Sequence, residues 1–273
     1  MSWLNLEKKI VVVTGAAAGI GKGIAIAFAE KGARVIIADI SRKGKDVITE
    51  LPGGRAGHLY IQTDITKGVS IEAMVKKALT ACKRIDILIN NAGINIPRLL
   101  VDPKDPKGKY ELHEEEFDKM VSVNQKGLFL CTQAVVREMI KRKVRGVIIN
   151  ISSECGLEGS EGQSCYAATK GASYAFTRSW AKEVGKYGIR VVGVAPGILE
   201  KTELRTLEYE NALAYTRGIT IEELRKGYKK VSIPLGRVGR LSEVGNLVCF
   251  LASDKASYTT GTTYNISGGK TRA

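Results

Sequence analysis

The chain has 273 residues, enough for one large α/β domain or two small ones, because domain number follows length only loosely. Hydrophobic residues make up 44% and charged residues 26%, a globular composition that excludes disorder as the main state. No apolar run approaches the roughly 18 residues that cross a bilayer, and residues 1–10 carry charges where a signal peptide is apolar. We therefore expect a cytoplasmic protein with no membrane partner.

The chain is strongly basic, with 42 Lys and Arg against 28 Asp and Glu and a formal net charge of +14 at pH 7. Such a surplus suits nucleic acid, an anionic membrane or an anionic substrate. The densest cluster, from Lys141 to Arg145, follows a long helical pattern, and cations favour a helix C-terminus. No aromatic-interleaved basic stripe accompanies the charge, so we expect no nucleic-acid partner.

The five cysteines and two histidines form no recognisable ligand pattern. The cysteines are odd in number, widely spaced and without a CxxC pair, which predicts neither a disulfide framework nor a zinc site. His58 and His113 lie near no serine or cysteine motif. We expect no metal and no histidine-based triad.

Seven short β-branched runs alternate with long amphipathic segments. Strands that are apolar throughout, such as residues 35–38, are typical of strands buried on both faces. Strand-helix alternation specifies a parallel sheet with right-handed crossovers. The sequence predicts one α/β domain over residues 1–273, a doubly wound seven-stranded parallel sheet with helices on both faces, and strands at 10–14, 34–39, 59–63, 86–90, 146–151, 189–195 and 263–266.

Two segments exceed the usual connection length. Residues 94–113 contain three prolines, and residues 198–232 show a broken helical pattern. Both follow the C-terminal ends of strands, where open α/β sheets bind ligands. We expect residues 198–232 to form the substrate loop.

A glycine-rich turn joins the first expected strand to a helix. Gly15 permits the tight turn, Gly19 lets backbone approach a pyrophosphate, and Gly21 allows close helix packing, while the helix N-terminus offers N–H groups to phosphate. Asp39 closes the second strand 18 residues beyond Gly21, where a carboxylate can bind an adenosine ribose. The pattern predicts a dinucleotide site.

The second strand also bears on the choice between NAD and NADP. Asp39 would repel a 2′-phosphate, and the turn residues 16–18 supply no cation to attract one. NAD is therefore the expected cofactor, although Arg42 and Lys43 lie nearby in the sequence.

Several motifs occur in order and in the expected strand contexts. They are TGxxxGxG from Thr14, Asn90-Asn91-Ala92-Gly93, Ser153, Tyr166-xxx-Lys170 and Pro196-Gly197. With these motifs the chain resembles the short-chain dehydrogenase/reductase family nearly from end to end. This resemblance implies a Rossmann-type fold and a homotetramer.

The chemistry of such an enzyme needs a proton carrier beside the hydride carrier. Tyrosine is too weak a base near neutral pH unless a cation stabilises its phenolate, and Lys170 lies on the same helix face as Tyr166. The resemblance implies that Ser153 holds the substrate oxygen, whereas Ser152 is structural. It also implies that Asn124 keeps a helix open for a water linking Lys170 to solvent.

The resemblance further implies which positions contact the cofactor. Thr202 stands one residue later than the frequent PGxxxT register of the family. The expected cofactor residues are Gly15, Gly19, Ile20, Gly21, Asp39, Ile40, Asp64, Ile65, Asn91, Ala92, Gly93, Tyr166, Lys170, Pro196, Gly197, Ile198 and Thr202.

The loop after Gly197 and the C-terminal tail are similar to those of family members that act on phosphorylated polyols. This implies NAD-dependent interconversion of a polyol phosphate and a ketose phosphate, with sorbitol 6-phosphate and fructose 6-phosphate as the expected pair. Residues 201–240 contain nine Lys and Arg against five Asp and Glu. Arginine suits phosphate because its planar fork donates two hydrogen bonds, so Arg205 and Arg217 are expected substrate contacts beside Ser153.

Other interpretations stay open. The phosphate could instead lie on the earlier long loop, which carries Arg98, Lys104 and Lys107. The chain could be a family member acting on an unphosphorylated polyol or a 3-oxoacyl substrate. It could also be a nicotinamide-binding regulator without catalysis, which the intact Asn124, Ser153, Tyr166 and Lys170 disfavour.

Overall fold

The computed structural model describes residues 3–229 and 233–271. Within these ranges a single sheet of seven parallel strands has the order β3-β2-β1-β4-β5-β6-β7. The strands are β1 Ile10–Thr14, β2 Arg34–Asp39, β3 Leu59–Gln62, β4 Ile87–Asn90, β5 Val147–Ile151, β6 Arg190–Pro196 and β7 Thr263–Ile266.

Helices connect the strands. The α-helices are α1 Gly19–Glu30, α2 Gly44–Glu50, α3 Gly54–Gly57, α4 Gly68–Cys82, α5 Glu114–Val121, α6 Leu128–Lys141, α7 Cys155–Glu158, α8 Ser164–Val184, α9 Leu207–Thr216, α10 Ile221–Lys229 and α11 Leu241–Ala252. Between α5 and α6 lies the π-helix η1, Ser122–Gly127, and two short 3₁₀ segments are η2 Gly185–Tyr187 and η3 Asp254–Ala256.

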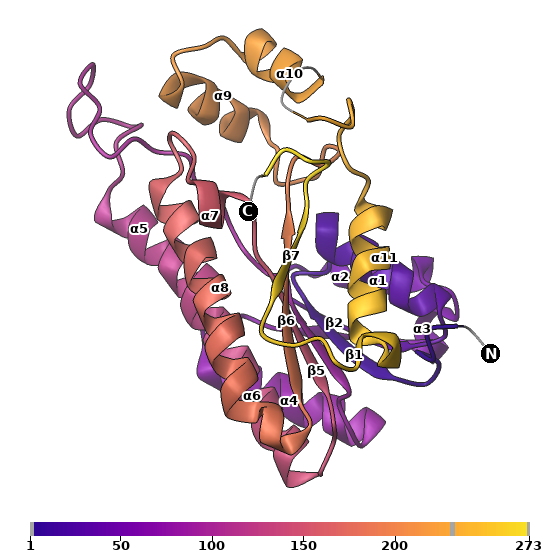
Figure 1. The fold of residues 1–273 in the computed structure, drawn as a ribbon. Helices are drawn as coiled ribbons and strands as arrows, with labels where there is room; N and C mark the ends of the chain where they lie inside the picture. The colour runs from indigo at the N-terminus through magenta and orange to yellow at the C-terminus, as the bar shows by residue number, and fades with distance from the viewer. Residues whose placement is uncertain (1–2, 230–232, 272–273) are drawn as a thin grey trace.

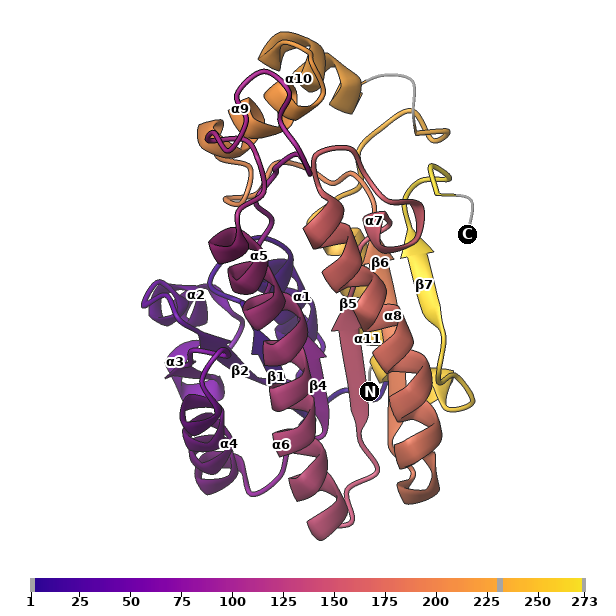
Figure 2. The ribbon, with the colours of Figure 1, turned by 90° about the vertical axis from the view of Figure 1, so that its left-hand side faces the viewer.

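The prediction of a doubly wound, Rossmann-type α/β fold is confirmed, and it follows from the strand sequences. Neighbouring strand residues point to opposite faces, so in β1 Val11 and Val13 face one core while Ile10 and Val12 face the other. Helices α1, α2 and α11 cover the first face, and α4, α6 and α8 cover the second (Figures 1 and 2). Strands β1, β2 and β7 have the predicted bounds, and each end of the others lies within one residue of its prediction.

The chain reverses its winding direction at β1, which lies between β2 and β4. In open α/β sheets such a switch point creates a crevice at the carboxyl ends of the strands. Helices α9 and α10 and the loop of residues 94–113 lie at this end of the sheet (Figures 1 and 2). The expected substrate loop thus contains two helices, and its residues 230–232 lie outside the described residues.

The two long segments contact each other above the sheet. The Tyr110 ring stacks on Tyr215 of α9 with their centroids 4.1 Å apart, and the Tyr215 hydroxyl donates a 2.8 Å hydrogen bond to Asp102. These contacts hold α9 against the loop of residues 94–113.

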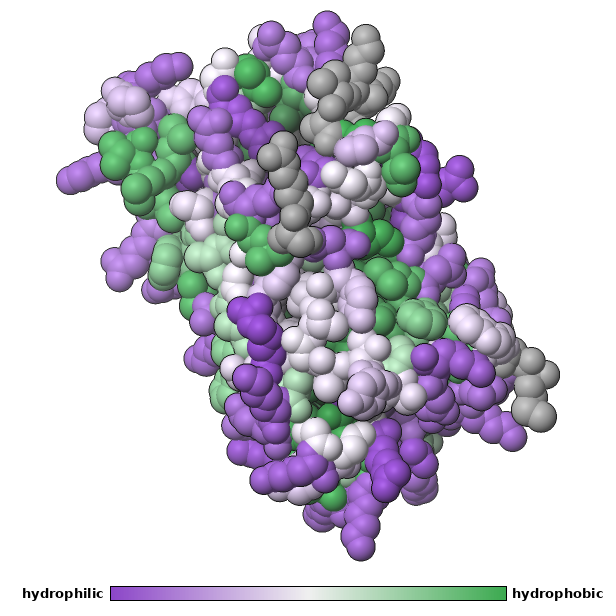
Figure 3. Space-filling model, viewed as in Figure 1, coloured by the Kyte–Doolittle hydropathy of each residue, from purple (hydrophilic) through white to green (hydrophobic). Residues whose placement is uncertain are grey.

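In the face shown in Figure 3, hydrophobic side chains occur as separate patches among hydrophilic ones. Among the described helices, none is both long enough and apolar enough to span a membrane.

Candidate active site

The turn between β1 and α1 needs glycine for reasons visible in its contacts. Gly15 has a φ of 65°, and a Cβ there would lie 2.6 Å from Ala92 Cα. The Asn91 amide donates to the Thr14 and Gly15 carbonyls at 3.0 and 2.9 Å, and a Cβ on Gly21 would lie 2.5 Å from the same amide nitrogen. The turn is therefore braced against the segment after β4, with no space for side chains.

A carboxylate occupies the N-terminus of α1. The Gly19 N–H donates a 3.1 Å hydrogen bond to Glu203 Oε2, and helix N-termini bind anions through such free N–H groups. Thr202 lies beside it, because a Cβ on Gly19 would be 3.4 Å from the Thr202 Cβ. The loop after β6 thus places a carboxylate oxygen where this turn could hold a phosphate oxygen.

The residues expected to contact the adenosine differ in their hydrogen-bond partners and in their burial. Asp39 accepts from the backbone N–H groups of Ala17 and Ser41, both at 2.8 Å, which fixes its carboxylate beside the turn. Ile40 is 64% exposed, whereas Ile65 is buried. The Asp64 carboxylate accepts from Thr66 at 2.6 Å, and this bond is the main reason that the pKa of Asp64 lies below its usual value.

The segment after β4 leads to the reaction centre. A Cβ on Gly93 would lie 3.3 Å from Asn124 Oδ1 and 3.5 Å from Lys170 Nζ. Gly93 therefore leaves room for a ligand, or for a water, between these two polar side chains.

Tyr166 and Ser153 meet at the carboxyl end of β5. Ser153 follows this strand, Tyr166 lies in the first turn of α8, and both residues line the same pocket. Burial raises the pKa of Tyr166 above its usual value, and the Ser153 hydroxyl opposes the rise without cancelling it. The raised pKa favours the protonated phenol, which can donate a proton to an oxygen.

Lys170 lies one turn further along α8. Its Nζ lies 5.8 Å from the centroid of the Tyr166 ring and donates a 2.8 Å hydrogen bond to the Ile151 carbonyl. Burial disfavours the charged form and lowers the pKa of Lys170 to about 8. Its ammonium group is therefore poised to exchange a proton near neutral pH.

Asn124 lies in η1, and π-helical turns of this kind are common at functional sites. The Ile94 N–H donates to Asn124 Oδ1 and Asn124 Nδ2 donates to the Ile94 carbonyl, both at 2.8 Å. The same Nδ2 donates to Thr169 of α8 at 3.1 Å. Asn124 thus joins η1, the segment after β4 and the helix that carries Tyr166 and Lys170.

Ser152 occupies a structural position. Its hydroxyl donates to the Lys170 carbonyl at 3.0 Å and accepts from Ser173 at 2.7 Å. The two neighbouring serines therefore face different partners, and only Ser153 lines the pocket described next.

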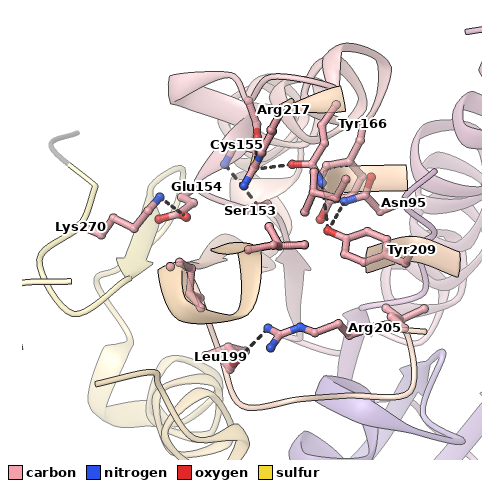
Figure 4. Close-up of a pocket in the computed structure, with 18 of the residues that line it drawn as sticks. Asn95, Ser153, Glu154, Cys155, Tyr166, Leu199, Arg205, Tyr209, Arg217 and Lys270 are labelled. Carbon is pink, nitrogen blue, oxygen red and sulfur yellow. Dashed lines mark hydrogen bonds and ion pairs between the residues drawn. The ribbon is translucent and has the colours of Figure 1, made fainter. Parts of the chain in front are cut away.

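A pocket of about 580 Å³ opens beside these groups. Its wall includes Ser153, Tyr166, Gly197 and Ile198, together with Thr202 and Ile20. Figure 4 shows side chains from α8, α9, the loop after β6 and the C-terminal tail converging on it.

Both arginines that the sequence singled out lie in the pocket wall. An Arg205 guanidinium nitrogen donates to the Leu199 carbonyl at 3.1 Å, and one of Arg217 donates to the Ser160 hydroxyl at 3.1 Å (Figure 4). Both of these contacts are made to neutral oxygen atoms.

Several other cations of the long loops face other partners. Arg225 pairs with Glu210 at 2.6 Å and Arg237 with Glu243 at 2.6 Å. Arg98 pairs with Glu116 at 3.1 Å, and Lys104 lies over the Tyr215 ring. The surplus of charge counted over residues 201–240 is therefore not a surplus within the pocket.

Sequence reasoning missed three polar side chains of the pocket wall, Asn95, Gln163 and Tyr209. Gln163 and Asn95 donate to the Tyr209 hydroxyl at 3.0 and 3.5 Å (Figure 4). The Gln163 bond connects α9 to the N-terminus of α8. No periodic pattern connects these residues. It also missed the pair of Glu154 and Lys270, although Glu154 directly follows Ser153.

Comparisons with known proteins agree with this geometry. A family model described as short chain dehydrogenase matches residues 9–212. Sorbitol-6-phosphate 2-dehydrogenase from Klebsiella pneumoniae is 56% identical over 271 residues, covering 99% of each chain. A 3-oxoacyl-[acyl-carrier-protein] reductase from Thermotoga maritima is 39% identical, covering 97% of this chain and 99% of the other.

A solved structure extends the likeness to three dimensions. The 3-ketoacyl-(acyl-carrier-protein) reductase from Brucella melitensis, in complex with NADH, has a TM-score of 0.81 and 30% identity, covering 98% of this chain and all of the other. The chain belongs to the short-chain dehydrogenase family. It is an oxidoreductase with a Rossmann-type site for a nicotinamide cofactor.

Proposed function

We propose that this enzyme interconverts sorbitol 6-phosphate and fructose 6-phosphate with NAD as the hydride acceptor. The observation that carries the proposal is the near end-to-end identity of 56% to a sorbitol-6-phosphate 2-dehydrogenase. The position of Arg205 and Arg217 in the wall that also contains Ser153 and Tyr166 supports it, because a phosphorylated polyol needs both an anion site and a proton carrier.

The chain's own residues account for the proton. A bound nicotinamide ring supplies the hydride chemistry. In ketose reduction, the protonated Tyr166 phenol donates to the carbonyl oxygen while the Ser153 hydroxyl stabilises the charge that develops there. Lys170, held beside Asn124, then returns a proton toward Tyr166. In polyol oxidation Tyr166 must first release its proton toward a neutral Lys170, and the resulting phenolate then accepts the proton of the substrate hydroxyl.

The fit of the site to a dinucleotide rests on its backbone. Glu203 bound to the Gly19 N–H is evidence that this turn accepts an anion, and the lack of a side chain at Gly93 leaves space in front of Lys170 and Asn124. Gly15, Gly19, Gly21, Asn91 and Gly93 would therefore hold the cofactor.

The preference for NAD over NADP rests on Asp39, whose carboxylate is fixed by two backbone N–H groups. A 2′-phosphate would meet this charge, while Arg42 and Lys43 are exposed. Replacing Asp39 with Ser should weaken NAD use and raise NADP use relative to it. A wild type that already prefers NADP would contradict this part of the proposal.

The substrate is tested with a panel. Purified enzyme is assayed for NADH formation with sorbitol 6-phosphate and sorbitol, and for reduction of a 3-oxoacyl thioester with NADH and with NADPH. The proposal predicts turnover of the phosphorylated polyol, and Arg205→Ala and Arg217→Ala should each lower its kcat/KM about tenfold or more, since a charge-assisted hydrogen bond contributes about 1.5 to 3 kcal/mol. Faster turnover of the thioester would replace the proposed function with an acyl reductase.

We also propose a cytoplasmic homotetramer, as the family resemblance implies. Aromatic side chains offer a surface for contacts between subunits. They are the exposed Phe117 of α5 and Phe129 of α6, and the stacked Phe176 and Trp180 of α8. Sedimentation equilibrium should give about four times the 29.5 kDa of the chain, and a monomer would contradict the assembly alone.

A further inference from the structure

A partly buried ion pair lies beside the reaction centre, between Glu154 and the C-terminal tail. Lys270 Nζ is 2.6 Å from Glu154 Oε1, and the Thr271 hydroxyl donates to Oε2 at 2.8 Å. Only 8% of the Glu154 side chain and 24% of the Lys270 side chain are exposed. Both residues line the substrate pocket, on the far side of Ser153 from Tyr209 (Figure 4).

The rest of the fold holds Glu154 in this place. Its N–H donates to the Pro196 carbonyl at 3.2 Å, and a Cβ on Gly197 would lie 2.9 Å from Glu154 Oε2. The Glu154 backbone is therefore bonded to the end of β6, and its carboxylate lies close to Gly197.

The tail is held just as closely. Gly268 and Gly269 have φ values of 65° and 88°, the Leu235 N–H donates to the Gly268 carbonyl at 3.1 Å, and the Thr271 N–H donates to Ser267 Oγ at 3.2 Å. These contacts hold the tail in the position where the Lys270 ammonium group meets Glu154.

The charge of the pocket gives this pair a consequence for substrate choice. Among the described residues, the wall contains four carboxylates, Glu154, Glu158, Glu200 and Glu223, against the three cations Arg205, Arg217 and Lys270. A phosphate monoester carries nearly two negative charges above its second pKa of about 6. An uncompensated carboxylate beside Ser153 would repel it, and repulsion is strong where water is excluded.

We propose that Lys270 is a specificity-determining residue, whose ammonium group neutralises Glu154 and thereby allows the pocket to admit a phosphorylated substrate. This inference rests on the proposed function. It assigns Lys270 no contact with the reacting atoms, and it leaves the phosphate itself to Arg205 and Arg217.

The test compares sorbitol 6-phosphate with sorbitol in four variants at matched ionic strength and pH 7.5. In Lys270→Met, the loss of kcat/KM for sorbitol 6-phosphate should exceed the loss for sorbitol by about tenfold or more. In the double variant Glu154→Gln with Lys270→Met, which removes both charges, the wild-type preference should return. Arg142→Met, which removes an exposed cation paired with Glu138 on α6, should leave the preference unchanged.

The fourth variant, Glu154→Gln, tests the inference even if Lys270→Met fails to fold. Glu154→Gln alone keeps the Lys270 cation, so the preference for sorbitol 6-phosphate should hold or rise, whereas a fall would overturn the inference. Equal losses for both polyols in Lys270→Met, or a double variant no better than the single one, would mean that the pair only supports the structure. A wild type without preference would contradict the proposed function instead.

Discussion

At the scale of single residues, the environment of Tyr166 defines which form of the phenol the site stabilises. Burial raises its pKa and the Ser153 hydroxyl lowers it, so the phenol keeps its proton at neutral pH and is ready for the reductive direction. Lys170, whose pKa burial lowers to about 8, is the group nearby that changes charge in the working range.

Replacing Tyr166 with Phe removes one hydroxyl and little volume. Since general acid catalysis contributes about 10²- to 10⁴-fold, kcat should fall by at least about a hundredfold, while NADH affinity, measured by fluorescence titration, changes by less than about threefold. Ser152→Ala is the matched control, because that hydroxyl contacts backbone of α8. Turnover near the wild-type rate in Tyr166→Phe would reassign the acid.

The pH dependence of ketose reduction should report Lys170. Its charged form predominates below about 8 and is lost as the pH rises through that value, so kcat/KM should be level near pH 7 and fall above about 8. Tyr166 keeps its proton over this range because its own pKa is raised. Lys170→Arg keeps a cation that does not titrate in this range, so the fall near pH 8 should disappear. A wild-type profile that is flat from pH 7 to 10 would contradict this assignment.

At the scale of elements, the segment after β6 connects the cofactor turn to the substrate pocket. Glu203 binds the N-terminus of α1, two residues before Arg205 in the pocket wall. A pyrophosphate on that N-terminus would compete with the Glu203 carboxylate for the same N–H group, so cofactor binding and the position of this segment are linked.

Replacing Glu203 with Gln removes the competing charge, and the dissociation constant for NADH should fall by about threefold or more, as expected for a contribution of about 1 kcal/mol at a helix N-terminus. Titration calorimetry gives this constant directly. Glu208→Gln, an exposed residue of the first turn of α9, should leave it unchanged. Weaker NADH binding in Glu203→Gln would show that the carboxylate assists the cofactor.

The elements were also the most predictable part of the molecule. Runs such as residues 34–39 are buried on both faces and carry their own strand signal, which is why every predicted strand is present. The glycine turn and the Tyr166-xxx-Lys170 motif were also predictable, because their residues lie close together in the sequence. Contacts between distant residues were not predictable, because Glu203 and Gly19 are separated by 184 positions and Lys270 and Glu154 by 116.

At the scale of the whole molecule, the net charge of +14 does not describe the pocket. Several cations of the substrate segment pair with glutamates, as Arg225 does with Glu210, and the pocket wall combines carboxylates with Arg205, Arg217 and Lys270. Phosphate recognition therefore depends on the placement of a few cations rather than on the overall charge.

The most direct test of the account is the ratio of kcat/KM for sorbitol 6-phosphate to that for sorbitol, measured with NAD at one ionic strength. A phosphate far from the reacting carbon can position that carbon against Tyr166, so its loss should lower kcat/KM and not only binding. Two charge-assisted hydrogen bonds of about 1.5 to 3 kcal/mol each predict a ratio of hundreds or more. Equal values for the two polyols would contradict the account.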